Sequence, residues 1–338
     1  MRVEVCTSTG TYPIIFEQGG LGKASEYFNL NRKALVVTDT GVPESYAQSL
    51  LSMCKEGALF TLPQGEEAKS LHYFEQLQLA MLNRSFTRKD CVVAVGGGVV
   101  GDAAGFAAAC YMRGIDFYNV PTTVLSQVDS SIGGKTAVNL QGVKNIVGCF
   151  YPPKGVLIDS ELLQTLPKRQ MSNGYAEIIK IALTRDASLF EMLENSPPFA
   201  RIEEAVRQAV LLKQEVVERD EREESLRKVL NFGHTLGHGI EAIQGQEGLY
   251  HGECVALGML PMCAPEVRVR LNKALKKYGL PTQIKVDKQA VIDKVMHDKK
   301  REGDAITVVY CGEVGRFSFE QRTEEQLTDA LYILEVGS

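Results

Sequence analysis

The sequence lacks the features that mark several large classes of protein. Lys and Arg number 37 against 42 Asp and Glu, so the formal net charge is -5 and no basic excess indicates a nucleic-acid-binding surface. The longest apolar region, 91–112, is interrupted by Gly96-Gly97-Gly98 and by Asp102, which argues against a membrane span. Residues 1–10 contain no basic segment followed by an apolar run, so no signal peptide is expected. We therefore expect a soluble, cytoplasmic protein whose partner is a small molecule, with no nucleic acid and no membrane.

Cysteine pairs at metal-finger spacing are also missing, although the chain has eight cysteines. Several of them lie inside apolar strand or helix patterns, where a thiol behaves as a small hydrophobic side chain. A cysteine-based metal site is therefore not expected, and a reducing cytoplasm fits this usage.

Length and periodicity predict two domains. A chain of 338 residues exceeds what one hydrophobic core usually fills, and 44% hydrophobic residues suffice for two cores. The first half alternates helical patterns such as 71–83 with short β-rich runs at 34–38, 91–95, 116–120 and 156–159. This alternation predicts a doubly wound, Rossmann-like α/β domain with a parallel sheet and helices on both faces.

The second half changes character after the breakers that end at Pro167. Long helical patterns follow, among them 202–224, and 305–311 predicts one late strand or hairpin. We therefore predict an α/β domain over residues 1–167 and a mainly α-helical domain over residues 168–338.

Histidine is scarce but clustered. Only five histidines occur, and His234, His238 and His251 lie in one short stretch. Neutral imidazole is the commonest metal ligand among protein side chains, so the cluster predicts a metal site. The four-residue spacing of the first two, with apolar residues such as Leu230 and Ile240, predicts a helix that places both imidazoles on one face.

A catalytic zinc ion usually has three protein ligands and one open position, so a third donor is needed. Either His251 or a carboxylate can supply it, and Glu177 is a candidate because it lies in an apolar helical run that would otherwise bury a charge. The alternative is that the histidines are only helix-face or capping residues.

A glycine-rich turn predicts a nucleotide site. The segment 96–102 follows an apolar strand and opens a helix of small residues, whose N-terminal amides suit a pyrophosphate. Its glycines have the G-x-G-x-x-G spacing, but no acidic residue follows about twenty positions later, as the usual dinucleotide fingerprint requires. Asp39, at the end of an earlier strand, is the candidate for the ribose hydroxyls, with 65–69 as a second loop. Tight packing through glycine is the structural alternative.

Basic residues near these features predict an anionic substrate. Lys180 follows Glu177 by about one helical turn, and Arg227 precedes His234 by about two, so each should share a face with a proposed ligand. Clustered lysine and arginine recognise phosphate and carboxylate groups best. Most lysines on a soluble protein are only solvated surface residues, and this alternative applies to at least half of the basic residues near these features.

Taken together, these residues resemble the 3-dehydroquinate synthase family of sugar-phosphate cyclases. The resemblance extends over most of the chain. Its motifs are 37–39, 65–66, 96–102, 121–123, 127–136, 144–145, 176–180, 231–238, 251–253 and 298–300.

The resemblance implies NAD, which is used and regenerated, and a zinc or cobalt ion in a homodimer that acts on a heptulosonate phosphate. It implies that the metal ligands are Glu177, His234 and His251, while His238 contacts substrate. The implied NAD contacts are Asp39, Glu66, Lys69, Gly97, Gly98, Asp102, Thr122, Thr123, Lys144 and Thr165. The implied substrate contacts are Asp129, Lys135, Asn145, Lys180, Lys213, Arg227, Asn231, His238, and Lys299 or Lys300, with Arg113 reaching across from a second subunit.

Two departures from the family pattern concern packing and not the proposed ligands. Ile181-Ala182 stands where tyrosine and glycine are usual, and the stretch 259–281 is short. Three other functions remain open: a cyclase for a different sugar phosphate, a metal-dependent polyol dehydrogenase that releases its NADH, and a non-catalytic NAD- and metal-binding regulator. The many basic residues argue against the dehydrogenase.

Overall fold

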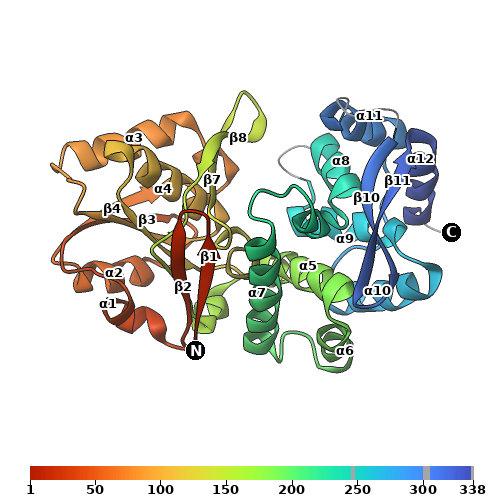
Figure 1. The fold of residues 1–338 in the computed structure, drawn as a ribbon, viewed down its shortest axis with the longest axis horizontal. Coiled ribbons are helices and arrows are strands. Elements are labelled where there is room, and N and C mark those ends of the chain that lie inside the picture. The colour runs from red at the N-terminus through yellow and green to blue at the C-terminus, as the bar shows by residue number, and fades with distance from the viewer. Residues whose placement is uncertain (245–247, 300–304, 336–338) are drawn as a thin grey trace. The chain divides into compact units, whose positions relative to one another are not determined.

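The computed structural model describes residues 1–244, 248–299 and 305–335 (Figure 1). The chain divides into two compact units, Met1–Leu166 and Pro167–Ser338, called unit 1 and unit 2 below. Among the described residues, no helix is both long enough and apolar enough to span a bilayer.

Unit 1 is built on a seven-stranded sheet, which confirms the predicted α/β class. The strand order is β1-β2-β9-β6-β5-β3-β4, and all neighbours are parallel except β1 and β2. The antiparallel edge hairpin was not predicted. The strands are β1 (Arg2–Thr7), β2 (Gly10–Phe16), β3 (Lys33–Asp39), β4 (Glu56–Leu62), β5 (Cys91–Gly96), β6 (Asp116–Pro121) and β9 (Gly155–Ile158).

Helices cover both faces of this sheet, as the valine-rich runs predict. Figure 1 shows α3 (Leu71–Leu82) and α4 (Gly98–Cys110) on one side, with α1 (Ala24–Tyr27) and α2 (Glu44–Met53) on the other. Alternate residues of β3 enter the two cores, so Leu35 packs with α3 and α4 whereas Val36 packs with α1 and α2. Because the strands are parallel, their carboxyl ends lie at one edge of the sheet, where ligands usually bind in such sheets.

A second, smaller sheet in unit 1 is the hairpin of β7 (Lys135–Leu140) and β8 (Val143–Phe150). Gln141 and Gly142, its two loop residues, both have positive φ (49° and 81°), as a type I′ turn requires. Most of β8 is exposed. A parallel bridge between Ser70 and Asn139 joins the hairpin to the start of α3.

Unit 2 is mainly helical, as predicted, and the only sheet among its described residues is the β10–β11 hairpin. The elements are α5 (Lys168–Arg185), α6 (Ala187–Asn195), α7 (Ile202–Arg219), α8 (His234–Gln244), α9 (His251–Met259), α10 (Pro265–Lys277), α11 (Lys288–Lys299), β10 (Ala305–Glu313), β11 (Arg316–Thr323) and α12 (Glu324–Leu331).

Two helix boundaries differ from the prediction. Helix α7 ends at Arg219 and does not continue to residue 224, because the Asp220 carboxylate accepts hydrogen bonds from backbone N–H groups further along the chain. Helix α8 begins at His234, whereas Leu230 belongs to a separate 3-10 helix, Leu226–Asn231. Gly233, between these two helices, has φ +77°, which is not helical. Arg227 and His234 therefore do not lie on one face of a single helix, and that prediction is wrong.

Candidate metal and anion site

The candidate metal site lies where three helices of unit 2 meet. Helix α5 is buried throughout its middle, Ser172–Thr184, and such a helix tolerates a polar side chain only when it is paired. Glu177 and Lys180 lie in this buried part, each 3% exposed. They meet the requirement for pairing, because the Lys180 ammonium forms an ion pair with Oε2 of Glu177. The predicted one-turn relation of these two residues is confirmed.

The other carboxylate oxygen of Glu177 faces two imidazoles. Its Oε1 lies 3.7 Å from Nε2 of His234 and 3.7 Å from Nε2 of His251. No hydrogen-bond partner for this buried oxygen exists within the described part of the chain. A buried acceptor without a partner is unfavourable, so the position suits a cation.

Both imidazoles are held through their other nitrogen. Nδ1 of His234 is 3.2 Å from the Phe232 carbonyl oxygen, and Nδ1 of His251 is 3.1 Å from Oε2 of Glu241. Because each of these acceptors calls for a proton on Nδ1, Nε2 is the nitrogen of each ring that faces Glu177 and can bind an ion once it is deprotonated.

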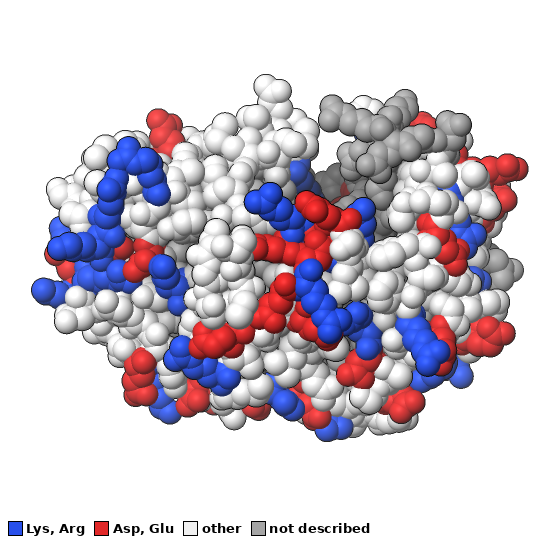
Figure 2. All heavy atoms as spheres, viewed as in Figure 1, with Lys and Arg blue, Asp and Glu red and all other residues white. Residues whose placement is uncertain are grey.

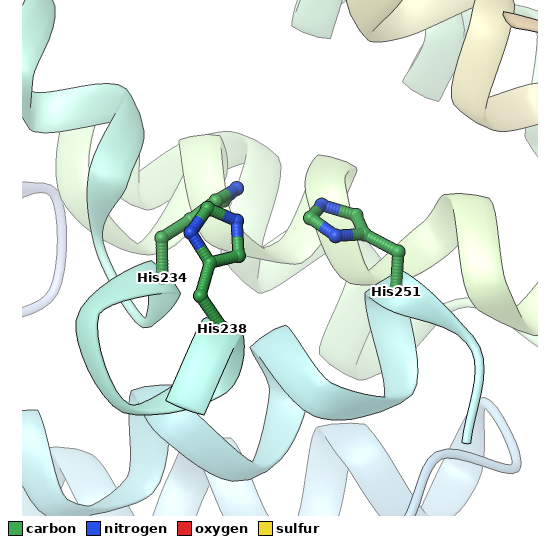
Figure 3. Close-up of side chains that lie close together, drawn as sticks. All are labelled: His234, His238 and His251. Carbon is green, nitrogen blue, oxygen red and sulfur yellow. The ribbon is translucent and has the colours of Figure 1, made fainter. Parts of the chain in front are cut away.

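His238 completes a group of three imidazoles from α8 and α9 whose rings turn toward one another (Figure 3). One nitrogen from each lies within 4.8 Å of the others. The helices approach closely at Gly258, where a Cβ would stand 2.0 Å from the Gly233 carbonyl oxygen. Small residues at this crossing therefore bring the histidines of α8 to His251.

The donor set fits a divalent ion. Two ligands bonded at 2.0–2.1 Å to one tetrahedral zinc ion are about 3.3 Å apart, near the 3.7 Å between Oε1 of Glu177 and each Nε2. Two imidazole nitrogens and one carboxylate oxygen are also the donor types of catalytic zinc sites. A set of three histidines is geometrically available as well.

Electrostatics in the site are strongly coupled. Burial opposes ionisation of Glu177, but Lys180 and the two imidazoles outweigh it and hold its pKa well below the usual range. Burial and Lys180 lower the pKa of His234, whereas the carboxylates of Glu177 and Glu241 overcome burial and raise the pKa of His251 to about 9. A metal ion must therefore displace a proton from His251.

Further buried cations belong to unit 2. Lys213 on α7 is 6% exposed and Arg227 is 3% exposed, and Arg227 Nη1 donates to the Glu221 carbonyl oxygen at 2.6 Å. Helix α5, which carries Lys180, packs against α7 and against the 3-10 helix that carries Arg227. Clustered lysine and arginine side chains recognise phosphate and carboxylate groups, so this region suits an anionic ligand.

Of the other predicted residues of unit 2, the structure describes the side chain of Asn231 but not those of Lys299 and Lys300. Asn231 ends the same 3-10 helix as Arg227, and its Nδ2 donates to Oε1 of Glu223 at 2.6 Å. Lys299 is the last residue of α11, but its side chain, like the whole of Lys300, lies outside the described residues.

In unit 1 the glycine turn follows β5 and begins α4, as predicted. Gly97 is the N-cap residue, without a side chain to satisfy the first helical amides. At Gly98 an added Cβ would lie 3.0 Å from Oγ of Ser130. The Thr122 amide donates to the Gly96 carbonyl oxygen at 2.9 Å, which places the predicted Thr122-Thr123 pair beside the turn.

Lys69 connects predicted residues from three segments. Its Nζ lies 2.5 Å from Oδ2 of Asp102 on α4 and also donates to Oδ1 of Asn145 on β8. Burial raises the pKa of Asp102 to about 6 despite this neighbouring ammonium. Residues predicted separately to contact NAD and substrate are thus joined directly.

The remaining predicted residues of unit 1 are more dispersed. Asp39 ends β3, where burial raises its pKa, and Oγ1 of Thr165 lies 3.2 Å from the Tyr46 hydroxyl. Lys135 lines a small pocket with Asp102, and Arg113 has φ +70° in the turn after α4. The other three predicted positions are Asp129 in the helical turn Ser126–Ser130, Glu66 in the 3-10 turn Glu66–Ala68, and Lys144 on β8.

Sequence reasoning assigned no role to several contacts that shape the site. Glu241, the partner of His251, lies on the same helix as His234 and two turns after it, so helical spacing could have indicated it. Arg169 forms two hydrogen bonds to Glu253, which accepts from the Tyr250 amide and fixes the first turn of α9. No local pattern marks that contact, because the two residues are far apart in the sequence.

Charge on the molecular surface is mixed. On the face drawn in Figure 2, lysine and arginine side chains are interspersed with aspartate and glutamate among the coloured residues. No broad basic area occurs on that face within the described residues, which agrees with the net charge of -5.

Comparison with known proteins identifies similar chains over the full length. Residues 59–173 match the family described as 3-dehydroquinate synthase N-terminal, and residues 174–301 match 3-dehydroquinate synthase C-terminal. A curated relative from Latilactobacillus sakei subsp. sakei (strain 23K), named 3-dehydroquinate synthase, is 38% identical over 331 residues and covers 93% of each chain.

Solved structures of sugar-phosphate cyclases have the same fold. A 2-deoxy-scyllo-inosose synthase complexed with carbaglucose-6-phosphate, NAD+ and Co2+ has a TM-score of 0.89 and 27% identity, covering 98% of this chain and 99% of that one. A 2-epi-5-epi-valiolone synthase from Streptomyces hygroscopicus subsp. jinggangensis 5008, with NAD+ and Zn2+ bound, has a TM-score of 0.87 and 27% identity over 99% of both chains.

Proposed function

The chain belongs to the 3-dehydroquinate synthase family, and from this premise we propose that it converts 3-deoxy-D-arabino-heptulosonate 7-phosphate to 3-dehydroquinate and phosphate. The reaction is a step of the shikimate pathway, with NAD and a divalent ion as cofactors. The observation that carries the proposal is the orphaned, buried Oε1 of Glu177, which faces two oriented imidazoles within a helical unit rich in buried cations.

The proposed metal ligands are Glu177, His234 and His251, and the ion is zinc or cobalt. The outer contacts of the two histidines support this set, since each Nε2 points at Glu177. His238 is then left to contact substrate. When bound, the ion polarises substrate oxygens and NAD accepts and returns a hydride.

Metal analysis of single variants tests this set against the three-histidine alternative. Glu177→Ala, His234→Ala and His251→Ala should each lose the bound equivalent of zinc, because each removes one of three donors, whereas His238→Ala should retain it. Loss of zinc from His238→Ala with retention by Glu177→Ala would favour the three histidines.

For NAD we propose the turn at Gly97 and Gly98 with Asp39, Glu66, Lys69, Asp102, Thr122, Thr123, Lys144 and Thr165. Open amides at the start of α4 suit a pyrophosphate. Asp39 ends a strand adjacent to β5, where a carboxylate can accept from ribose hydroxyls.

For the phosphosugar we propose Lys180, Lys213 and Arg227 as the main anion contacts, with Asp129, Lys135, Asn145, Asn231, His238 and Lys299 or Lys300. Cations that are buried and fixed in advance hold phosphate and carboxylate without reorganisation during the reaction. A substrate held in one conformer can use its own departing phosphate as a base, which is a proximity effect.

We also propose that the enzyme is a cytoplasmic homodimer in which Arg113 reaches the site of the second copy. The left-handed backbone at Arg113 and the 46% exposed Met112 beside it support a specialised, outward-facing turn.

Activity on a different sugar phosphate is the second candidate, favoured by the similarity to a cyclase complexed with carbaglucose-6-phosphate. Phosphate release from the heptulosonate phosphate and from glucose 6-phosphate, each with NAD and zinc, separates the two. We expect release from the heptulosonate only, and it should stop on chelation. Release from glucose 6-phosphate alone would support the second candidate.

A further inference from the structure

Asn139, on β7, connects two segments of unit 1 that carry proposed ligand contacts. One is the nucleotide loop, defined here as Glu66–Lys69 and proposed for NAD. The other is the tip of the β7–β8 hairpin, which carries Lys144, also proposed for NAD, and Asn145, proposed for substrate. No sequence motif marks Asn139, because residues 66 and 139 are brought together only by the fold.

Three hydrogen bonds of equal length fix Asn139 between these segments. Its backbone N–H donates to the Lys69 carbonyl oxygen at 2.8 Å, and its side-chain Nδ2 donates to Oε1 of Glu66 at 2.8 Å. Its Oδ1 accepts from the Asn145 amide, also at 2.8 Å. The donor and the acceptor of one amide side chain therefore face opposite segments.

The contact with Asn139 helps to fix the backbone conformation of Asn145 and the direction of its side chain. Asn145 has φ +58°, an uncommon left-handed conformation that asparagine adopts more readily than most residues and that persists where neighbours fix it. In this conformation its side-chain Oδ1 accepts from Lys69 Nζ, and the same ammonium pairs with Asp102. The hairpin and the nucleotide loop thus share one hydrogen-bonded network.

We propose that Asn139 is a positioning residue that couples NAD binding at the Glu66–Lys69 loop to the conformation of the hairpin that presents Asn145 to substrate. This inference rests on the proposed function for the roles of Glu66, Lys69 and Asn145. Asn139 is not among the residues proposed to contact either ligand. Ordering of the loop by NAD stabilises the hairpin through the shared side chain, and by linkage the hairpin stabilises bound NAD equally.

The first test replaces the side-chain donor of Asn139 by an acceptor. Asn139→Asp keeps an acceptor for the Asn145 amide but sets a carboxylate against Glu66, so the Kd for NAD should rise about tenfold in calorimetric titration of the zinc-loaded full chain. In a Glu66→Gln background the side-chain amide at position 66 can donate to the introduced carboxylate, so the same Asn139→Asp substitution should change the Kd less than about twofold. Equal effects in the two backgrounds would overturn the proposal.

The second test measures the coupling between NAD binding and the hairpin directly, and it does not depend on the Kd for NAD. In the wild type, saturating NAD should slow hydrogen exchange of the hairpin amides in residues 139–145. Asn139→Ala removes both side-chain hydrogen bonds, and the slowing should then be lost even at saturation. Asn83→Ala, at an exposed position after α3, is the matched control and should behave as wild type.

The outcomes distinguish this inference from the proposed function. A wild-type chain that does not bind NAD would refute the proposed function and the coupling with it. Normal NAD binding with full hairpin protection in Asn139→Ala would refute the coupling alone.

Discussion

At the residue scale, His251 illustrates that atoms remote from the proposed ion organise its site. Glu241 holds Nδ1 at 3.1 Å and thereby leaves Nε2 for Glu177. A backbone carbonyl does the same for His234. Carboxylate partners of this kind orient the ring and increase its basicity as a ligand.

We predict that Glu241→Ala weakens zinc binding about 10–100-fold, because the ring of His251 loses its orienting acceptor. Glu241→Gln should lose less, since its amide oxygen still accepts from Nδ1. Affinity is measured by competition with a chromogenic chelator. Glu194→Ala is the control, because Glu194 is similarly exposed (22% against 19%) and pairs with Arg270 instead. Unchanged affinity in Glu241→Ala would contradict the assignment.

Composition and local spacing identified, as candidate site residues, those whose side chains are unusual for their surroundings. The clustered histidines and a glutamate in an apolar helix were recognisable because a buried charge or imidazole needs a reason. The choice between Glu177 and His238 came from resemblance alone. Asn139 was not recognisable, since its three partners are brought to it by the fold.

At the element scale, strands were easier to predict than helix ends. Buried parallel strands have continuous valine-rich runs, and β3, β5, β6 and β9 were all found in this way. The edge hairpin β1–β2, the edge strand β4 and the hairpin β7–β8 were not predicted. Apolar periodicity also could not show that Asp220 ends α7 or that Gly233 separates Arg227 from α8, because side-chain capping and positive φ leave no periodic signal.

Asp220 organises the segment that carries Arg227, and its effect should depend on pH. Burial opposes its ionisation, but N–H groups of Arg227, Ser225 and Glu224 lower its pKa from 3.8 to about 2. Because the folded pKa is depressed, the stabilisation is complete above about pH 4 and is lost as the pH falls toward 2.

Asp220→Asn should therefore lower the free energy of unfolding by roughly 1 kcal/mol at pH 7, allowing for solvent screening. The difference from wild type should shrink below pH 4. Urea denaturation at pH 7, 5, 4 and 3 measures it, with the exposed Asp329→Asn as control. A difference that stays constant down to pH 3 would contradict the role of the charge.

At the scale of the whole molecule, the two units have different chemical characters. Unit 1 has a mostly parallel sheet with a glycine turn at a helix start, and unit 2 has buried carboxylate and cationic side chains beside a cluster of imidazoles. Oxidation alone needs a hydride acceptor and a metal, as in the polyol dehydrogenase alternative. The buried Lys180, Lys213 and Arg227 suit a substrate that also carries phosphate or carboxylate.

The most direct test of this account follows phosphate and reduced nicotinamide together during turnover of the heptulosonate phosphate by the zinc-loaded protein. We predict one phosphate and one dehydroquinate per substrate, an absolute requirement for NAD, and no net accumulation of NADH, because the hydride is returned within each cycle. Steady formation of NADH without phosphate release would contradict the cyclase function and support a dehydrogenase.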